Sequence, residues 1–177
     1  MNNPKLIFIP ENKFNSYVIE NPETNVSGRG DVFITIEYDD NRKERCYLRN
    51  TLLRKGKIAL AKSLANDVSE VYNFYINRML FGTNGVSGDT PKYVDDSRSG
   101  LFGSTVLSKT VISSIDSSAP TTAIFTSVIT KDEANGEELS EMALEMKNGE
   151  LYSMLTFPVL TKTSQMQLTI NWRITLL

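Results

Sequence analysis

The chain has 177 residues, of which 40% are hydrophobic and 23% are charged, and its formal net charge at pH 7 is -2. This composition is typical of one folded domain with a substantial core, and it excludes a disordered or collagen-like chain. The sequence has no histidine and a single cysteine, which excludes an internal disulfide, a thiolate metal site and the commonest catalytic base. We expect this residue, Cys46, to be a small buried hydrophobic side chain rather than a nucleophile.

The N-terminal region, residues 1–30, contains one apolar run and few regular patterns. The run, residues 6–9, ends at Pro10 and is too short for the core of a signal peptide or for a membrane span. We therefore expect the protein to be made in a cytoplasm. Because turn-forming residues dominate the rest of the region, we predict an extended arm that adds to an edge of its own sheet or of a neighbour's sheet.

A hairpin is predicted over residues 31–49. Apolar side chains alternate with other residues from Val32 to Tyr38, which is the period of a strand. A polar turn at residues 39–41 then leads to a returning strand at residues 44–49.

One long helix is predicted over residues 50–73. Asn50 is a favourable N-cap residue, and the apolar side chains that follow recur at helical spacing in a segment rich in Ala, Leu, Lys and Arg. We expect this helix to lie across the sheet, with Gly56 at a point of close approach.

A buried strand and a long loop are predicted after the helix. Residues 74–81 are dense in apolar and aromatic side chains, which favours a strand that is buried on both faces. Residues 82–103 are rich in Gly, Ser and Asp and form the loop. Because loops of this length in a compact domain are usually functional, we predict an interaction loop.

The remainder, residues 104–177, is predicted to consist of antiparallel strands. We expect them at residues 104–115, 123–130, 139–146 and 151–157, with Pro158 ending the last of these. Asn148-Gly149 is a strong signal for a two-residue hairpin turn. Six apolar residues alternate with polar ones over residues 165–177, which predicts a central strand with one buried face.

Together these elements predict an α+β fold that is mainly β. We expect a single domain, residues 1–177, built as an antiparallel, sandwich-like arrangement of sheets. One long helix packs across it, and an N-terminal hairpin and an extended arm complete it.

Charge is unevenly distributed along the chain. Eight basic residues lie between Arg42 and Lys62, and seven acidic residues lie between Lys131 and Glu150. Two interpretations stay open. The runs are either two solvated faces or complementary patches that meet within the fold or between subunits.

The sequence offers few candidates for catalysis or metal binding. The carboxylates Asp95 and Asp96, and a second group at Glu137, Glu138 and Glu141, could serve acid-base chemistry or bind calcium. No spacing among them matches a calcium loop, so we favour solvated acids. The glycine-rich residues 82–88 lack the Gly-Lys-Ser/Thr ending of a phosphate loop. We therefore predict no enzymatic activity, no catalytic residues, no cofactor and no metal.

Several motifs in the second part of the chain occur in a recognisable order. They are the helix at residues 52–64, Phe-Gly-Thr-Asn-Gly at 81–85, Arg-Ser-Gly-Leu-Phe-Gly at 98–103, Phe-Thr-Ser-Val-Ile at 125–129, Asn135-Gly136, Leu-Ser-Glu-Met-Ala-Leu at 139–144, Asn-Gly-Glu-Leu-Tyr at 148–152, Thr-Phe-Pro at 156–158, Lys162 and Trp172. This succession, over residues 50–177, resembles the attachment domain of tailed-bacteriophage tail-collar and tail-fibre proteins. In that family a helix packed on a sheet precedes a hairpin, and the domains fasten fibres to a baseplate or collar.

The chain departs from this family at both ends. Residues 1–49 add a hairpin and an arm before the helix, and no fibre shaft follows Leu177. We therefore do not expect a complete fibre.

The resemblance implies a structural protein of a phage virion. We expect a multi-copy adaptor in the tail collar, neck or baseplate, which docks neighbouring tail or fibre proteins and forms a homo-oligomer, most simply a ring. We expect neither a membrane nor nucleic acid as partner, because the aromatic residues are not interleaved with the basic ones. The predicted protein interface consists of Leu6, Ile7, Phe8, Ile9, Arg54, Lys55, Tyr93, Arg98 and Phe102.

An alternative function comes from a different class of protein. Long loops on a sandwich commonly bind ligands, so the chain could be a receptor- or glycan-binding module of a tail fibre or tail tip. The loop at residues 82–103 has few aromatic side chains for stacking on sugars, namely Tyr93 and Phe102, which counts against this alternative.

Overall fold

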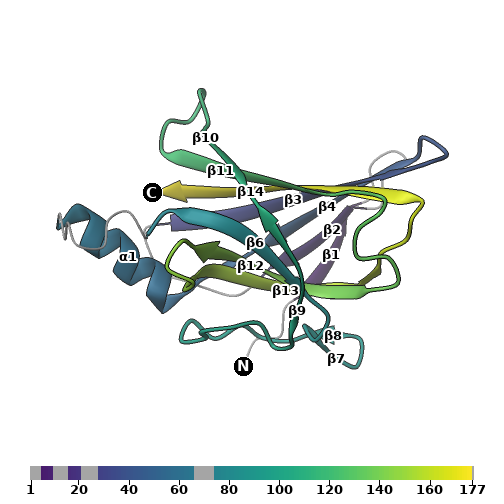
Figure 1. Ribbon diagram of the computed structural model, residues 1–177, viewed down its shortest axis with the longest axis horizontal. Helices are drawn as coiled ribbons and strands as arrows, with labels where there is room; N and C mark the ends of the chain where they lie inside the picture. Colours follow the sequence, from purple (N-terminus) through teal and green to yellow (C-terminus); the bar gives the residue numbers. More distant parts are fainter. Residues whose placement is uncertain (1–4, 10–15, 21–27, 66–73, 177) are drawn as a thin grey trace.

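The computed structural model describes the backbone of residues 5–9, 16–20, 28–65 and 74–176, and the side chains of residues 30–65 and 74–176. In this part of the chain, two larger and mainly antiparallel sheets pack face to face, and one helix lies at one end of them (Figure 1). The predicted class, an α+β fold that is mainly β and sandwich-like, is confirmed.

The first sheet has seven strands. In spatial order they are β1 (Lys5–Ile9), β2 (Ser16–Glu20), β4 (Lys43–Arg49), β3 (Gly28–Tyr38), β14 (Met166–Leu176), β11 (Thr122–Ile129) and β10 (Ile112–Ile115). Neighbouring strands are antiparallel except β2 and β4, which run parallel. The N-terminal strands thus add to an edge of the chain's own sheet, which is one of the two alternatives for the predicted arm.

The second sheet has five strands. In spatial order they are β5 (Thr51–Leu52), β13 (Leu151–Thr161), β12 (Glu138–Met146), β6 (Ile76–Gly82) and β9 (Thr105–Thr110). A small hairpin of β7 (Val86–Ser87) and β8 (Thr90–Pro91) lies within the long loop. The predicted strand at residues 74–81 is confirmed as β6, but it begins at Ile76 and is buried on both faces only in its second half, where Met79, Leu80 and Phe81 are buried.

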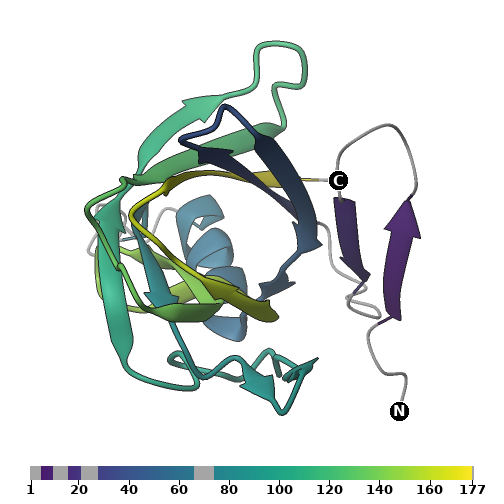
Figure 2. The same ribbon diagram turned by 90° about the vertical axis from the view of Figure 1, so that its right-hand side faces the viewer.

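The two sheets are joined along both sides by strands that switch sheets. Strand β4 belongs to the first sheet and continues past Asn50 as β5 of the second, while β9 of the second continues past Val111 as β10 of the first. The Val111 N–H donates to the Asn77 carbonyl at 3.2 Å at this corner. Such corners let two packed sheets share strands, and Figure 2 shows the sheets curving around a common interior.

The predicted C-terminal strand is confirmed as β14, which lies between β3 and β11. Leu168, Ile170, Trp172 and Ile174 are buried, and the polar residues between them are not. A shift of one residue would bring this whole set of side chains into water, at roughly 1.5–3 kcal/mol each. The apolar alternation therefore fixes the register of the strand.

The helix differs from its prediction. Helix α1 spans Arg54–Leu64, and its N-cap is Leu53 rather than Asn50. Residues 51 and 52 pair with β13 instead, so the gain from strand pairing outweighs the capping preference of Asn50. The Ala65 N–H donates to the Ala61 carbonyl where the helix ends. The predicted continuation over residues 66–73 lies outside the described residues.

The helix approaches the second sheet closely at Gly56, as predicted. A Cβ atom at this position would lie 2.4 Å from the carbonyl oxygen of Tyr152 in β13, which no side chain could tolerate. Leu60 packs from the same helix against the main core. No helix in the described residues is long and apolar enough to cross a membrane.

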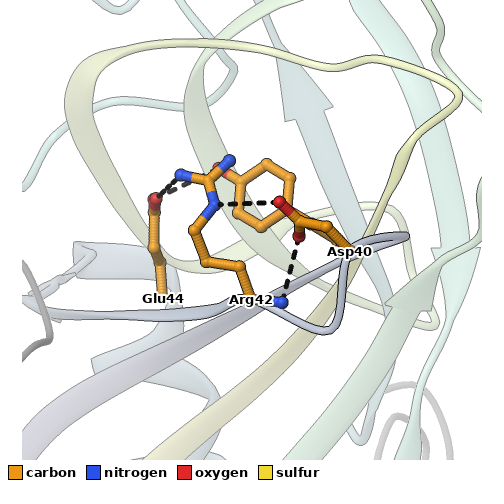
Figure 3. Close-up of polar contacts among 4 residues, drawn as sticks. Asp40, Arg42 and Glu44 are labelled. Carbon is orange, nitrogen blue, oxygen red and sulfur yellow. Dashed lines mark hydrogen bonds and ion pairs between the residues drawn. The ribbon is translucent and has the colours of Figure 1, made fainter.

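The predicted hairpin at residues 31–49 is confirmed as β3 and β4. At its turn, Arg42 lies between two carboxylates: its Nη1 atom is 2.6 Å from Oε1 of Glu44, and its Nε atom is 3.8 Å from Oδ2 of Asp40 (Figure 3). The guanidinium also stacks over the ring of Tyr38, 3.8 Å from the centroid. Exposed pairs of this kind contribute about 0.2–1 kcal/mol each, so the turn is ordered by several weak contacts.

The two charged runs meet within the fold at one place that the structure describes. Lys55 Nζ, at the start of α1, lies 2.6 Å from Oε1 of Glu150. Elsewhere in the basic run, Lys43 pairs with Glu37 inside the first hairpin. Within one copy of the chain, the runs thus touch at the start of α1, and a contact between the runs of different subunits stays a prediction.

The prediction that Pro158 ends its strand is wrong, because β13 continues to Thr161. Glu141 lies opposite Thr156 and Leu139 opposite Leu160, so residues 157–159 bulge where the ladder is irregular. Proline lacks an N–H group, and a bulge is a place where no ladder hydrogen bond is lost. A turn forms at Asn148-Gly149 as predicted, but its loop has three residues, 147–149, rather than two: the Gly149 N–H donates to the Met146 carbonyl, the Met146 N–H donates to the Glu150 carbonyl, and Gly149 has a φ of 84°.

Candidate functional site

The most distinctive site is the long loop between β6 and β9, residues 82–103, which carries Tyr93, Arg98 and Phe102 of the predicted interface. It begins at the end of β6, forms the small β7–β8 hairpin, and returns to β9. Part of it is anchored by burial: Val94 is fully buried in a cluster with Leu53 and Met154. The loop is thus packed on the second sheet rather than extended into solvent.

A buried carboxylate ties the two ends of this loop together. Glu141 in β12 is completely buried. Its Oε1 atom accepts hydrogen bonds from the N–H groups of Asn84 at 3.2 Å and Gly103 at 2.9 Å, and its Oε2 atom accepts one from Phe102 at 2.6 Å. Because both ends of the loop donate to one carboxylate, the charge is compensated and the loop is closed at its base.

The neighbouring residue on the same strand strengthens this attachment. The Gly85 N–H donates to Ser140 Oγ at 2.9 Å. A Cβ atom at position 85 would lie 2.0 Å from the Ser140 carbonyl oxygen, so only glycine allows the loop to approach the strand this closely. We call the set of contacts from Ser140 and Glu141 to residues 84, 85, 102 and 103 the loop clasp.

The exposed part of the loop is ordered by contacts between cations and an aromatic ring. The Arg98 guanidinium lies 3.6 Å from the centroid of the Phe102 ring, and Lys92 Nζ lies 5.1 Å from it. Arg98 also donates to the carbonyl oxygens of Gly100 and Leu101, each at 3.0 Å. Tyr93 is 61% exposed and is free to contact another molecule.

The first turn of α1 lies against the same loop. The Arg54 N–H donates to the Asp96 carbonyl at 2.7 Å, and Lys57 Nζ lies 2.7 Å from Asp96 Oδ2. The side chains of Arg54 and Lys55 are exposed beside this contact. The structure therefore brings part of the predicted interface, at the start of α1, against the loop that carries its aromatic residues.

The remaining predicted interface residues, Leu6, Ile7, Phe8 and Ile9, lie elsewhere. They belong to β1, the terminal strand of the seven-stranded sheet, where each pairs with a residue of β2. The loop packs on the other sheet. The predicted interface thus separates into two surfaces rather than one.

The acidic candidates do not converge on one point in the described residues. The Asp95 carboxylate accepts hydrogen bonds from the side chain and the N–H of Ser97, which lower its pKa. Asp96 pairs with Lys57. Glu138 is exposed, as expected, but the prediction that Glu141 is solvated is wrong. No group of three or more metal-ligating side chains occurs in the described part of the chain.

The sequence contains a signal for Glu141 that local reasoning missed. The acid stands inside a run that is otherwise uncharged, residues 139–144, and every member of that run is buried. An acid in a buried strand needs compensating donors. Those donors are 57 residues away at Asn84 and 39 and 38 residues away at Phe102 and Gly103, so spacing within the strand could not identify them.

Sequence reasoning also missed a buried lysine. Lys162 is fully buried, and its Nζ atom donates to the carbonyl oxygen of Thr163 at 2.8 Å, to Asn135 Oδ1 at 3.1 Å and to the carbonyl oxygen of Lys131 at 3.3 Å. Burial lowers its pKa, against the opposing effect of nearby acidic residues. Three oxygen acceptors satisfy the three N–H bonds of the ammonium, so this side chain pins the turn before β12 to the end of β13.

Cys46 lines a cavity of about 420 Å³ between β4 and β13, whose wall is mainly apolar but includes Glu44 and Asp89. Burial, and secondarily Glu44, raises the pKa of the thiol to about 11. The side chain is therefore protonated at neutral pH, although it is half-buried rather than buried as expected.

No protein-family model matches the chain, and no curated protein or solved structure is significantly similar to it. The likeness to phage attachment domains thus depends on the order of the sequence motifs alone.

Proposed function

We propose that this chain is a non-enzymatic structural component of a bacteriophage tail, in the collar, neck or baseplate. It is present in several copies and docks neighbouring tail or fibre proteins through the surface formed by residues 92–102 and the first turn of α1. The observation that carries the proposal is the loop clasp. A fully buried carboxylate is devoted to holding the base of one loop.

The clasp supports a docking role because it fixes the loop before any partner binds. A flexible loop loses conformational freedom on binding, at about 0.5–1.5 kcal/mol for each side chain that becomes immobilised. Here the backbone is held by hydrogen bonds to Glu141 and Ser140, and the ring of Phe102 contacts Arg98 and Lys92. Because the loop is already ordered, little conformational freedom is lost on binding, and its contacts with a partner contribute to affinity and orientation.

The composition of the exposed surface is also that of a protein interface. Tyrosine and arginine are enriched among the residues that dominate binding energy, and they act best next to ordered, well-packed neighbours. Tyr93 is exposed, Arg98 is half-buried over an aromatic ring, and Arg54 is exposed on the adjoining helix.

Immunogold electron microscopy of purified virions of the phage that encodes this chain tests the proposal. Antibodies raised against the purified protein should label the tail, neck or baseplate at a constant position. Absence of the chain from purified virions would contradict the proposal. Label confined to fibre tips, together with binding of the purified protein to host envelopes, would instead support a receptor-binding module.

A further inference from the structure

The seven-stranded sheet has a free edge at each of its two ends. In the part of the chain that the structure describes, β10 is paired only with β11, and β1 is paired only with β2. Figure 2 shows the two terminal strands on opposite sides of the molecule, with the purple β1 at the right and β10 at the upper left. Each therefore offers unpaired backbone groups in a different direction.

The edge at β10 lacks the features that normally protect such an edge. All four of its residues, Ile112, Ser113, Ser114 and Ile115, are exposed, and the two isoleucines are 76% and 63% exposed. The strand contains no charged residue and no proline. Natural proteins usually block a free edge with charges, proline or a bulge, so an unblocked edge with exposed isoleucines is suited to pairing with another strand.

An apolar hollow of about 330 Å³ opens beside this edge. Ser113 and Ile115 line it, together with Ala123 and Phe125 of the paired strand β11, so these residues share one face of the sheet. None of the described residues that line it is charged. Tyr75 and Leu176, also in the lining, are 53% and 46% exposed. A strand added to β10 would place every second side chain over the hollow.

We propose that β1 of a second copy of this chain pairs with the free edge of β10, and that apolar side chains from its residues 6–9 fill the hollow. Those residues form an uncharged apolar run of four, Leu6, Ile7, Phe8 and Ile9, which matches an uncharged edge of four residues. The unpaired parts of β13 and β9 in the second sheet fit the edge of β10 less well, because β13 contains Pro158 and β9 contains Lys109.

A symmetric pairing of β10 with itself fits less well. A two-fold axis perpendicular to the sheet places residues of the same face opposite each other. Centred on Ser114, it puts Ile112 opposite the charged Asp116. Centred on Ser113, it puts Ile115 opposite Val111, whose N–H is already bonded to Asn77 of β6.

The proposed contact joins two different surfaces of the same chain, so it is head-to-tail. Each copy contributes β1 to one neighbour and β10 to the other, and the seven-stranded sheet continues from copy to copy. Such a contact forms a closed ring when its rotation returns to the starting copy. The inference goes beyond the proposed function, because a loop that docks another protein needs no contact between copies.

Two full-length variants test the contact by light scattering coupled to size-exclusion chromatography. Ile115→Lys places a charge at the β10 edge and leaves β1 intact. The double variant Ile7→Lys with Phe8→Lys leaves β10 intact, and because adjacent residues of a strand face opposite sides, one of its lysines must face the hollow. Val159→Lys, at a 45% exposed position on β13, is the matched control.

The wild type and the control should assemble, and each edge variant alone should be monomeric. An equal mixture of the two edge variants should give a pair of twice the monomer mass and nothing larger, since only one complete contact remains. A monomeric wild type, an Ile115→Lys variant that still assembles, or a mixture that stays monomeric would overturn the proposal. If Ile115→Lys does not fold, Ile112→Lys takes its place, because its side chain is the more exposed. The measurement uses the purified chain alone, so its outcome is independent of the role of the loop clasp.

Discussion

Substitution of Glu141 by glutamine should release the long loop without removing the volume of the side chain. In the native protein Oε1 accepts two N–H groups and Oε2 accepts one. In Glu141→Gln, an NH2 group replaces one oxygen whichever way the amide is oriented, and it then faces at least one N–H donor. At least one part-buried N–H loses its acceptor, and the others lose a charged one.

The expected cost follows from these contacts. A buried donor left without a partner costs about 1–3 kcal/mol, and hydrogen bonds to charged groups contribute about 1.5–3 kcal/mol each. We therefore expect Glu141→Gln to lower the free energy of unfolding by about 2–4 kcal/mol. Glu138→Gln, on the same strand but exposed, is the matched control and should change the free energy of unfolding by less than about 0.5 kcal/mol.

Urea denaturation gives the free energies, and hydrogen exchange reports on the loop directly. The amides of Asn84, Phe102 and Gly103 should exchange faster in Glu141→Gln and should keep their native rates in Glu138→Gln. Equal stability of the two variants, or unchanged protection of the three amides, would refute the idea that the buried carboxylate holds the loop.

Four further predictions follow from other contacts. Gly85→Ala should destabilise the fold by about 2–4 kcal/mol in urea denaturation, because its Cβ would meet the Ser140 carbonyl at 2.0 Å; a cost near zero would show that the strand and loop can separate freely. Lys162→Met should lower the free energy of unfolding in urea by about 2 kcal/mol, since three oxygens lose their donor. Lys147→Met, at an exposed position, should leave it unchanged. Hydrogen bonds from Ser118, and secondarily Arg173, lower the pKa of Asp116 from 3.8 to about 2, so its contribution to stability is complete above about pH 5 and is lost as the pH falls through 3.8 towards 2; Asp116→Asn should weaken the loss of stability measured between pH 5 and pH 2. Cys46, with its pKa raised to about 11, should react with iodoacetamide at pH 8 more slowly in the native protein than after unfolding, and equal rates in the two states would contradict its assigned environment.

The strands could be predicted where their pattern is local. In β14, apolar and polar residues alternate over the whole strand, and this alternation alone indicates which face is buried. The β3–β4 and β12–β13 hairpins have short turns with suitable residues, so pairing partners are close in sequence. In these cases the local preference and the tertiary structure agree.

The start of the helix could not be predicted in the same way. Asn50 has the intrinsic preference of an N-cap, but Thr51 and Leu52 find strand partners in β13, about a hundred residues later in the chain. The Asn50 side chain instead lies so close to Gly30 that a Cβ there would clash with it. A distant pairing thus overrides a local preference, and no short window of sequence contains both partners.

The loop clasp escaped prediction for a related reason. The sequence indicates a long loop with Tyr93, Arg98 and Phe102, and it indicates a strand around Glu141. It does not indicate that the strand's acid faces the two ends of the loop. That relation depends on the pairing of β6 with β12, which places Gly82 opposite Glu141.

Incorporation of loop variants into virions tests the central claim most directly. Phage particles would be assembled in host cells that supply either the wild-type chain or the double variant Tyr93→Ala with Arg98→Ala, and the amount of the chain in purified virions would be measured by quantitative mass spectrometry. The account predicts that the variant folds with native cooperativity and is depleted from virions relative to the wild type. Incorporation of the variant at the wild-type level would contradict it.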